Sequence, residues 1–418
     1  MLISTSDLGH GAGIAAYRLH QGLNAAGVES RMLVSDKLSD DPAVVQVPPP
    51  PRSMAGRAVR RLLRMCEYAL NQAGPQNLFS LAAPWTLRHP WTDSAGVIHL
   101  HNIHWHSRNF SPLMLPYLSR KKPLVWTIHD MWPLTGHCYN PIDCERWLEG
   151  CGRCPDLKSY IRLSVDTTAA MVRLKRSMVE KSRMVIVTPS RWMKGQVEES
   201  SIFYGKDVRC ISNGVDTRVF RPLDRAVARD GLGIPQASTV ILFVASRLHD
   251  PMKGYMYFLE TLARLNLPKN NALVLTMGSG SLPLDSLAGF PMKSVGYVAD
   301  ESRMAKVYAA ADVLVMPSLQ DNLPNVVLEC LACGTPVVCF DAGGLKDMVR
   351  HGENGYVARH KNTDDLAAGI EFVLAYPDGG RQLRHEAVKT VRDGFTLERM
   401  VQAHLSLYAE LSGQMGEA

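Results

Sequence analysis

The first 34 residues, MLISTSDLGHGAGIAAYRLHQGLNAAGVESRMLV, decide the fold class. Residues 1–5 are a short apolar run typical of a strand, and a turn with three glycines follows at residues 9–13. Residues 14–26 have the apolar spacing of an amphipathic helix, and Gly27 ends that helix before a second strand at 31–34. A strand, turn, helix and strand in this order predict a parallel sheet with crossover helices, the doubly wound α/β fold.

The same alternation of apolar runs and helical patterns continues along the chain. The further strands predicted are 97–100, 123–128, 184–188 and 208–211, then 239–245, 272–277, 294–296, 313–317 and 336–340. A polar, irregular segment separates the two series, and a final helical pattern follows Thr396, a possible N-cap. The sequence therefore predicts two α/β domains, 1–213 and 239–395, with an interdomain connection at 214–238 and a C-terminal helix in 396–418.

Length and composition limit the class of protein. The chain has 418 residues, of which 46% are hydrophobic and 21% are charged, as in ordinary globular domains. No apolar run approaches the roughly 18 residues of a membrane-spanning helix, and no basic leader precedes an apolar segment. We therefore expect a cytoplasmic protein whose nine cysteines are reduced or bind metal. The first strand is short on its N-terminal side, which leaves open whether the natural chain starts a few residues earlier.

Positive charge is concentrated in the first half of the chain. Before Asn213 there are 26 basic and 17 acidic residues, and from Asn213 onward there are 20 basic and 23 acidic residues. Residues 57–70 predict a basic amphipathic helix with four arginines on one face, namely Arg57, Arg60, Arg61 and Arg64. This helix is either a surface helix with a solvated arginine face or a docking site for anionic lipid or a lipid-diphosphate acceptor. No zinc-finger or aromatic-interleaved basic pattern favours nucleic acid.

The segment from Pro317 to Pro336, PSLQDNLPNVVLECLACGTP, carries the most chemistry. Asp321 follows a predicted strand, and Glu329 lies eight residues later on the next helix, with the helix N-terminus between them. Unpaired amides and the positive end of the helix dipole suit a phosphate, and the two carboxylates suit sugar hydroxyls on either side of it. This arrangement favours a nucleotide-sugar ligand.

These residues resemble the retaining GT-B glycosyltransferases of family 4, in which two carboxylates spaced in this way precede a small-residue helix and a Gly-x-Pro-Val-Val strand. The residues in register are Glu329, Ala332, Gly334, Pro336, Val337 and Val338. Asp321 replaces the usual first glutamate and shortens its reach by one methylene. The resemblance implies that Glu329 holds the ribose hydroxyls and that the amides near Asn322 and Leu323 face the distal phosphate of the donor.

Further positions extend the resemblance over nearly the whole chain. Arg247 and Lys253, directly after the strand at 239–245, match cations that neutralise the donor diphosphate in the family. The chain has no Asp-x-Asp pair, which argues against metal-dependent transfer. The glycine turn with Gly11 and Gly13 resembles a loop that closes on the diphosphate, although glycines there often serve only tight packing. Backbone groups that would read the nucleobase are expected at Gly278, Tyr297 and Val298.

Histidines follow two predicted strands of the first domain. His129 follows the strand at 123–128, where many family members carry a histidine beside the reacting centre, so the resemblance makes His129 the residue that orients or polarises that centre. The run at His99, His101, His104 and His106 resembles the preceding strand end, and His101 and His104 are candidates to line the acceptor pocket. A metal site made of these histidines alone is disfavoured, because alternate residues of a strand face opposite sides.

Four cysteines lie within 17 residues of a loop-like segment, at Cys138, Cys144, Cys151 and Cys154. Four thiolates fit a structural zinc, although the spacing of the first pair is irregular for a zinc ribbon. Free thiols fit as well, and disulfides are disfavoured by the expected compartment. The other cysteines lie in apolar surroundings and are predicted to be core residues; they are Cys66, Cys210, Cys330, Cys333 and Cys339.

Together these features predict a GT-B fold with an acceptor-binding first domain, a nucleotide-sugar-binding second domain and a C-terminal helix able to cross back to the first. The resemblance implies a metal-independent, retaining glycosyltransferase that uses a nucleoside-diphosphate sugar and a lipid-linked saccharide acceptor. It further implies bacterial cell-surface polysaccharide synthesis at the inner face of the plasma membrane. The alternatives are a small-acceptor GT-B enzyme, a sugar-nucleotide epimerase, and a sugar-nucleotide-binding protein without turnover.

Overall fold

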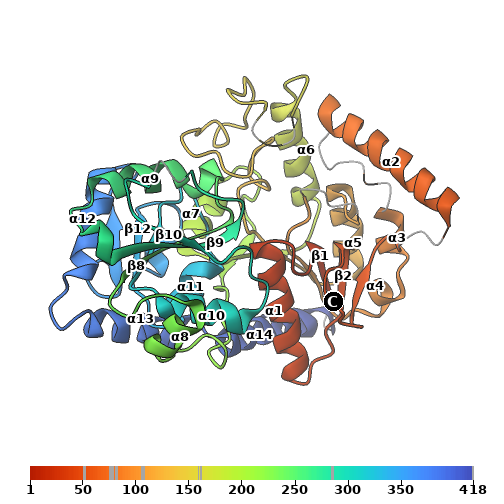
Figure 1. Ribbon diagram of the computed structural model, residues 1–418. Helices are drawn as coiled ribbons and strands as arrows, with labels where there is room; N and C mark the ends of the chain where they lie inside the picture. Colours follow the sequence, from red (N-terminus) through yellow and green to blue (C-terminus); the bar gives the residue numbers. More distant parts are fainter. Residues whose placement is uncertain are drawn as a thin grey trace. The chain divides into compact units, whose positions relative to one another are not determined.

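The structure is a computed structural model that describes residues 1–49, 53–74, 80, 83–104, 109–158, 160, 162–283 and 287–416, without the side chains of Arg60 and 414–416. The chain divides into two compact units (Figure 1). The first unit comprises residues 1–211 and 401–418, and the second comprises residues 212–400. Among the described residues, no helix combines the length and the apolar character needed to cross a bilayer.

The first unit contains a seven-stranded parallel sheet with the strand order β3-β2-β1-β4-β5-β6-β7. Its strands are β1 (Leu2–Ser6), β2 (Met32–Asp36), β3 (Val44–Gln46), β4 (Ile98–Leu100), β5 (Leu124–Thr127), β6 (Val185–Thr188) and β7 (Asp207–Cys210). Its helices are α1 (Gly11–Ala25), α2 (Met54–Ala73), α3 (Ala83–Leu87), α4 (Pro90–Ser94), α5 (Leu115–Lys121), α6 (Thr168–Glu180) and α7 (Arg191–Glu199). The central strands are buried along their whole length, as expected for a parallel sheet covered on both faces.

The second unit contains a six-stranded parallel sheet with the order β10-β9-β8-β11-β12-β13. Its strands are β8 (Thr239–Arg247), β9 (Ala272–Ser279), β10 (Met292–Ser294), β11 (Val313–Met316), β12 (Val337–Phe340) and β13 (Gly355–Ala358). Its helices are α8 (Arg225–Leu232), α9 (Tyr255–Arg264), α10 (Glu301–Ala310), α11 (Asn325–Ala332), α12 (Thr363–Leu374) and α13 (Arg381–Gly394). The predicted doubly wound architecture is thus confirmed in each unit.

The last helix, α14 (Leu397–Gly416), returns to the first unit from residue 401 onward. Leu407 is buried against Val125 of β5 and against Val185 and Val187 of β6. Burial of such a side chain contributes about 1.5–3 kcal/mol, enough to fasten the helix to this sheet. The chain therefore crosses back as predicted.

Two strands were missed by the sequence interpretation, and one was placed wrongly. The missed strands are β3, which is only three residues long, and β13, which begins with a glycine. The strand predicted at 294–296 lies at Met292–Ser294, because the backbone turns at Gly296 with φ +72. All three are short strands at the edges of their sheets. Edge strands are less buried, so their sequences show the weakest run of apolar residues.

In each sheet the order of strands reverses at one point, between β1 and β4 in the first unit and between β8 and β11 in the second. At such a point the connections leave toward opposite faces, so a crevice opens beyond the carboxyl ends of the two strands. Ligands of doubly wound folds bind in this crevice. The residues that follow β1, β4, β8 and β11 are therefore the first place to look for a site.

Candidate functional site

At the reversal point of the second sheet, a cation and a carboxylate face each other. The Nζ of Lys253 lies 2.9 Å from both Oδ1 and Oδ2 of Asp321. Lys253 is in a short 3₁₀ turn after β8, and Asp321 is in the loop after β11. Their side chains are 28% and 16% exposed, so the pair borders solvent and is open to a ligand. The sequence interpretation gave the two residues separate roles and did not predict that they pair.

Glycines hold the backbone on both sides of this pair. Gly254 has φ +71, and a Cβ there would lie 1.8 Å from the carbonyl oxygen of Pro317, so only glycine fits. This contact packs the turn that carries Lys253 against the end of β11. Gly343 has φ +59, and its neighbour Gly344 donates its N–H to the carbonyl of Asp321 at 2.9 Å. The backbone therefore positions both members of the pair.

Glu329 is almost fully buried on α11, with 2% of its surface exposed. Its Oε2 accepts a 2.8 Å hydrogen bond from the hydroxyl of Tyr308, which lies on α10. Burial and the neighbouring carboxylate raise the pKa of Tyr308 well above its usual value, so the hydroxyl keeps its proton and donates. The sequence interpretation missed Tyr308, because nothing in the spacing of a helix reveals which neighbouring helix it will contact.

The loop between β11 and α11 includes Asn322, which is half-buried, and Leu323, which is buried. The carbonyl of Leu323 accepts a hydrogen bond of 3.3 Å from the side chain of Asn213, a further residue that the sequence interpretation did not assign. Pro324 occupies the N-cap position of α11 and supplies no capping side chain. The helix N-terminus beside Asp321 thus retains the anion-attracting character expected from the sequence.

Arg247 ends β8 and has an exposed side chain, 67% accessible, with its NH2 group 3.9 Å from the carboxylate of Asp250. Long, exposed side chains of this kind reach a ligand by reorienting rather than by a fixed contact. The side chains of Arg247 and Lys253 both follow β8, at the carboxyl edge of the sheet. This is the placement that the sequence predicted for two diphosphate-neutralising cations.

The three residues predicted to meet a nucleobase lie near one another at the ends of β9 and β10. Gly278 is in β9 with φ +150, and its N–H donates to the carbonyl of Gly296 at 2.9 Å. That amide is therefore already engaged within the sheet edge. Tyr297 is 63% exposed and Val298 is 8% exposed, which leaves Tyr297 as the side chain able to contact a base.

In the first unit, Gly11 and Gly13 begin α1 directly after β1. A Cβ at Gly13 would lie 2.7 Å from the carbonyl oxygen of Ser6, so this glycine permits close packing of helix on strand. The N–H of Gly13 donates to Nδ1 of His10 at 3.2 Å. Of the two interpretations of the glycine turn, the contacts favour tight packing at Gly13, with His10 as the helix cap.

The histidines in and after β4 and β5 form three hydrogen-bonded groups. His101 Nδ1 lies 3.1 Å from His129 Nε2, because β4 and β5 are adjacent parallel strands. His104 lies 2.8 Å from both Asp130 and Tyr160, through its Nε2 and Nδ1 respectively. His99 contacts Tyr408 of α14 and Thr127. The structure brings His101 and His129 together, which the sequence did not predict, and His106 lies outside the described residues.

Burial keeps most of these imidazoles neutral. It lowers the pKa of His129 to about 4, and it lowers the pKa values of His99 and His101 well below the usual value. His10 behaves in the same way, with a pKa of about 4. A neutral His129 can accept or donate a hydrogen bond but carries no charge at physiological pH.

The lowered pKa values of these histidines predict a pH-dependent stability. The unfolded chain takes up protons near pH 6.5, whereas native His10 and His129 do so only near 4. The free energy of unfolding should therefore be greatest above about pH 6.5 and fall as the pH is lowered, by up to about 1.4 kcal/mol per pH unit for each such histidine. Urea unfolding at about pH 7 and about pH 5 measures this loss. A smaller loss is expected in His129→Gln, and an equal loss in that variant would contradict the assignment.

Helix α2 extends the predicted basic helix to Met54–Ala73. Arg57, Arg61 and Arg64 are exposed, and the side chain of Arg60 lies outside the described residues. The opposite face is exposed as well; its large apolar side chains, all at least 40% accessible, are Val59, Leu62, Leu63 and Leu70. Figure 1 shows α2 at the margin of the first unit, away from its sheet. The arginine face is thus exposed, which agrees with both predicted roles of this helix, a surface helix with a solvated arginine face and a docking site.

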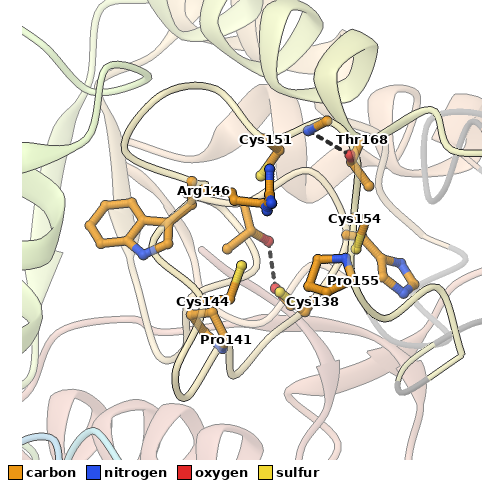
Figure 2. A pocket seen from close by; sticks show the side chains of 12 residues that line it. Cys138, Pro141, Cys144, Arg146, Cys151, Cys154, Pro155 and Thr168 are labelled. Carbon is orange, nitrogen blue, oxygen red and sulfur yellow. Dashed lines mark hydrogen bonds between the residues drawn. The ribbon is translucent and has the colours of Figure 1, made fainter.

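The cysteines divide into three groups. Cys330, Cys333 and Cys339 are buried in the core of the second unit, as predicted. Cys66 and Cys210 are exposed, contrary to the prediction, since one lies on α2 and the other on the edge strand β7. The four cysteines of the predicted zinc site line a single pocket (Figure 2). Within the described part of the chain, no three His, Cys, Asp or Glu side chains stand ready to hold a metal ion.

Comparison with known proteins agrees with this architecture. Two parallel-sheet units of this kind, each with helices on its sheet, are the architecture of the GT-B class of fold. The family model "Glycosyltransferase Family 4" matches residues 9–219, and "Glycosyl transferases group 1" matches residues 238–375. The chain belongs to glycosyltransferase family 4.

Two curated relatives illustrate the sequence similarity. A D-inositol 3-phosphate glycosyltransferase of Geodermatophilus obscurus is 32% identical over 265 residues, which cover 58% of this chain and 57% of the relative. The putative colanic acid biosynthesis glycosyl transferase WcaC of Escherichia coli is 26% identical over 331 residues, covering 77% and 78% of the two chains. The alignments with the first four curated relatives span 54–61% of the length of those proteins.

Solved structures share the fold over nearly the whole chain. Sucrose-phosphate synthase of Thermosynechococcus elongatus has a TM-score of 0.70 at 19% identity, covering 99% of this chain and 98% of its own. HepE of Anabaena, solved with UDP and glucose, has a TM-score of 0.64 at 16% identity, with coverage of 98% and 99%. WaaG, a glycosyltransferase involved in lipopolysaccharide biosynthesis, has a TM-score of 0.65 at 17% identity, with coverage of 96% and 97%.

Proposed function

We propose that this protein is a retaining glycosyltransferase that moves a sugar from a nucleoside diphosphate to a hydroxyl group of a lipid-linked saccharide. The observation that carries the proposal is the set of groups at the reversal point of the second sheet. There Lys253, Asp321 and the uncapped start of α11 lie together, and Glu329 is held ready on the same helix by Tyr308. Cations and helix amides can bind the diphosphate of a nucleotide-sugar, and fixed carboxylates can accept hydrogen bonds from the hydroxyl groups of its two sugars.

The proposed donor lies with its diphosphate at Lys253, Arg247 and the amides around Asn322 and Leu323. Glu329 accepts hydrogen bonds from the ribose hydroxyls, and Asp321 accepts from the transferred sugar. Tyr297 contacts the base together with the backbone at Gly278 and Val298. A UDP-glucose complex of HepE, which shares the fold, supports a nucleotide-sugar as the ligand class.

In the proposed reaction, the bond between the anomeric carbon and the diphosphate oxygen breaks, and a bond from that carbon to the acceptor oxygen forms on the same face of the sugar. The acceptor proton passes to the departing diphosphate oxygen, so no enzyme nucleophile is needed. Lys253 and Arg247 stabilise the charge that develops on that oxygen, which fixed cations do without a metal ion. His129, neutral and oriented by His101, hydrogen-bonds at the reacting centre.

Nucleotide binding tests the donor site. UDP, GDP and ADP are each titrated into the protein, and one of them is expected to raise the melting temperature, because a ligand that binds only the native state stabilises it. At a fixed nucleotide concentration, the shift should be clearly smaller in Glu329→Gln and unchanged in Glu353→Gln, which changes an exposed glutamate of the same unit. Absence of a shift with every nucleotide and every sugar conjugate would contradict the proposal.

Asp321 provides a sharper prediction. Asp321→Asn releases Lys253 from its ion pair, so the nucleoside diphosphate alone should bind at least as tightly as before. The same change replaces a charged acceptor with a neutral one and so weakens the hydrogen bonds to the transferred sugar; the preference for the sugar conjugate over the bare diphosphate should therefore fall about tenfold, the value of one hydrogen bond to a charged group. Calorimetric titration of both ligands measures this ratio. An unchanged ratio would exclude contact between Asp321 and the sugar.

Helix α2 supports a membrane-bound acceptor. Its arginines offer about 1 kcal/mol each at an anionic surface, and its exposed apolar side chains can enter the headgroup region without unpacking a core. The names of WcaC and WaaG, which refer to colanic acid and lipopolysaccharide, support a surface polysaccharide as the product. We therefore propose that the protein acts at the inner face of the plasma membrane on a lipid-linked saccharide.

Vesicle sedimentation tests the role of α2. The protein should bind phosphatidylglycerol vesicles and not phosphatidylcholine vesicles, and added salt should weaken the binding. Replacing Arg57, Arg61 and Arg64 together by glutamine should lower the affinity about 100-fold, from three contributions of about 1 kcal/mol. A matched variant with glutamine at Arg350, Arg381 and Arg392, which lie in the second unit, should bind like wild type. Equal binding by both variants would contradict the assignment to α2.

A further inference from the structure

A long loop of the first unit carries four thiols that the proposed transfer reaction does not use. The loop, residues 128–167, joins β5 to α6 and contains no helix or strand in the positions that the structure describes. A loop of this length without helix or strand is uncommon within a compact domain, so we expect an additional interaction, such as a bound ion, to stabilise it. Cys138, Cys144, Cys151 and Cys154 all come from this loop and line one pocket.

The four thiols surround the pocket rather than form disulfides. Each of them is a free cysteine in the structure. Figure 2 shows their side chains around the cavity, with the side chain of Arg146 among them. Pairwise bridges would cross-link only short loops, whereas a shared ligand would join all four chain positions at once.

The backbone next to Cys151 and Cys154 adopts left-handed conformations. Four consecutive residues from Gly150 to Arg153 have positive φ angles of 100°, 60°, 92° and 49°, and two of these residues are not glycine. Such conformations cost about 1–3 kcal/mol for each non-glycine residue and persist only where the surroundings hold them. This turn directs both Cys151 and Cys154 to the pocket. The N–H of Gly136 donates to Sγ of Cys151 at 3.3 Å, the kind of bond that stabilises a thiolate ligand.

A lysine and an arginine lie beside the pocket, and the carboxylate of Asp166 lies at its edge, where it accepts hydrogen bonds from the N–H of Cys154 and the hydroxyl of Thr168. Lys175, on α6, is buried, and its Nζ donates to the carbonyls of Trp132 and Thr135 at 2.6 and 2.8 Å. It also lies 3.5 Å from the centre of the Trp132 ring. No ion pair joins Lys175 to a carboxylate in the described part of the chain, and the residues that line the pocket include Arg146 but no Asp or Glu. Burial lowers the pKa of Lys175 to about 7, so this lysine carries a full charge only when an anionic partner lies nearby.

We propose that Cys138, Cys144, Cys151 and Cys154 bind one structural Zn²⁺ ion, which cross-links the 128–167 loop. Four thiolates on Zn²⁺ make a dianion, for which Lys175 and Arg146 supply the compensating charges. In the described part of the chain, the four Sγ atoms are not arranged to coordinate an ion. Binding therefore requires that these side chains move until each Sγ lies about 2.3 Å from the Zn²⁺. Each thiol gives up its proton to the solvent as the ion binds.

Metal analysis of the full-length protein tests this site. The protein is purified with a non-thiol reductant and without chelator, and its metal content is measured by inductively coupled plasma mass spectrometry. We expect about one zinc ion per chain, because a single structural site binds one ion. Cys144→Ser and Cys154→Ser should each lose most of that zinc, whereas Cys210→Ser, at an exposed cysteine of the same unit, should retain it. Equal zinc in all three variants would show adventitious binding and overturn the proposal.

A measurement on wild type avoids the risk that the serine variants fail to fold. Release of the metal by a mercurial reagent and a chelator, followed by removal of the reagent, should lower the melting temperature, and added Zn²⁺ should restore it. Replacement by Co²⁺ should give the absorption bands of tetrahedral thiolate coordination. Two results would overturn the proposal: purified wild type that contains no zinc while its four loop thiols react freely, or disulfides within the loop. Neither result would bear on the proposed donor site.

Discussion

Replacing Lys253 by alanine is expected to lower kcat/KM for the sugar donor by about 100- to 1,000-fold, the usual cost of removing one group that stabilises transition-state charge. The effect has two parts. The variant loses the cation that faces the departing diphosphate, and it leaves the carboxylate of Asp321 without its partner at 2.9 Å. An uncompensated carboxylate then repels the diphosphate. Steady-state kinetics of donor consumption measures the loss.

The double variant Lys253→Ala/Asp321→Asn separates the two parts. Since it removes both charges, it should recover part of the activity that Lys253→Ala loses, and the double-mutant cycle should show a coupling of about 1 kcal/mol or more. Arg264→Ala, at an exposed arginine paired with Glu260, serves as the control and should be close to wild type. A Lys253→Ala variant with full kcat/KM would contradict the assignment of this lysine to the diphosphate.

The second large effect is expected at Glu329. Glu329→Gln should weaken donor binding by about 10- to 150-fold, because hydrogen bonds to a charged group contribute about 1.5–3 kcal/mol. The amide keeps an acceptor for the Tyr308 hydroxyl, so the buried contact survives and the fold with it. The ribose lies away from the reacting bond, so the loss should appear mainly in KM for the donor and less in kcat.

Tyr308→Phe distinguishes direct contact from positioning. This variant leaves the carboxylate of Glu329 in place but removes the hydroxyl that orients it, so a smaller rise in KM is expected together with a loss of stability of about 1–3 kcal/mol. Glu353→Gln, on the exposed surface of the same unit, should match wild type. An unchanged KM in Glu329→Gln would show that this carboxylate does not meet the donor.

The sequence predicted the architecture well because buried parallel strands are nearly continuous apolar runs. The runs at β1, β5, β6, β8, β11 and β12 were each found within a residue or two. The edge strands β3 and β13 were missed, since one is three residues long and the other begins with glycine. For α2, periodicity predicted the two faces but not that the apolar face is exposed, because amphipathic periodicity alone does not say whether a partner is present.

For the site, spacing along the chain located Arg247, Lys253, Asp321 and Glu329 at the carboxyl edge of one sheet. It did not show that Lys253 and Asp321 pair, because their meeting depends on the close approach of Gly254 to Pro317. Nor did it show that the Tyr308 hydroxyl hydrogen-bonds to Glu329, since these residues are 21 positions apart and lie on two different helices. Contacts between elements come from packing, and a single sequence carries no periodic signal for them.

The most direct test of the central claim is transfer itself. Purified protein is incubated with a labelled nucleoside-diphosphate sugar and bacterial lipid-linked saccharides, and the product and the released nucleoside diphosphate are measured together. We expect equal amounts of the two, retention of the anomeric configuration by nuclear magnetic resonance, and loss of both products in Lys253→Ala. Binding of a sugar nucleotide without transfer to any acceptor, or inversion at the anomeric carbon, would contradict the proposed function.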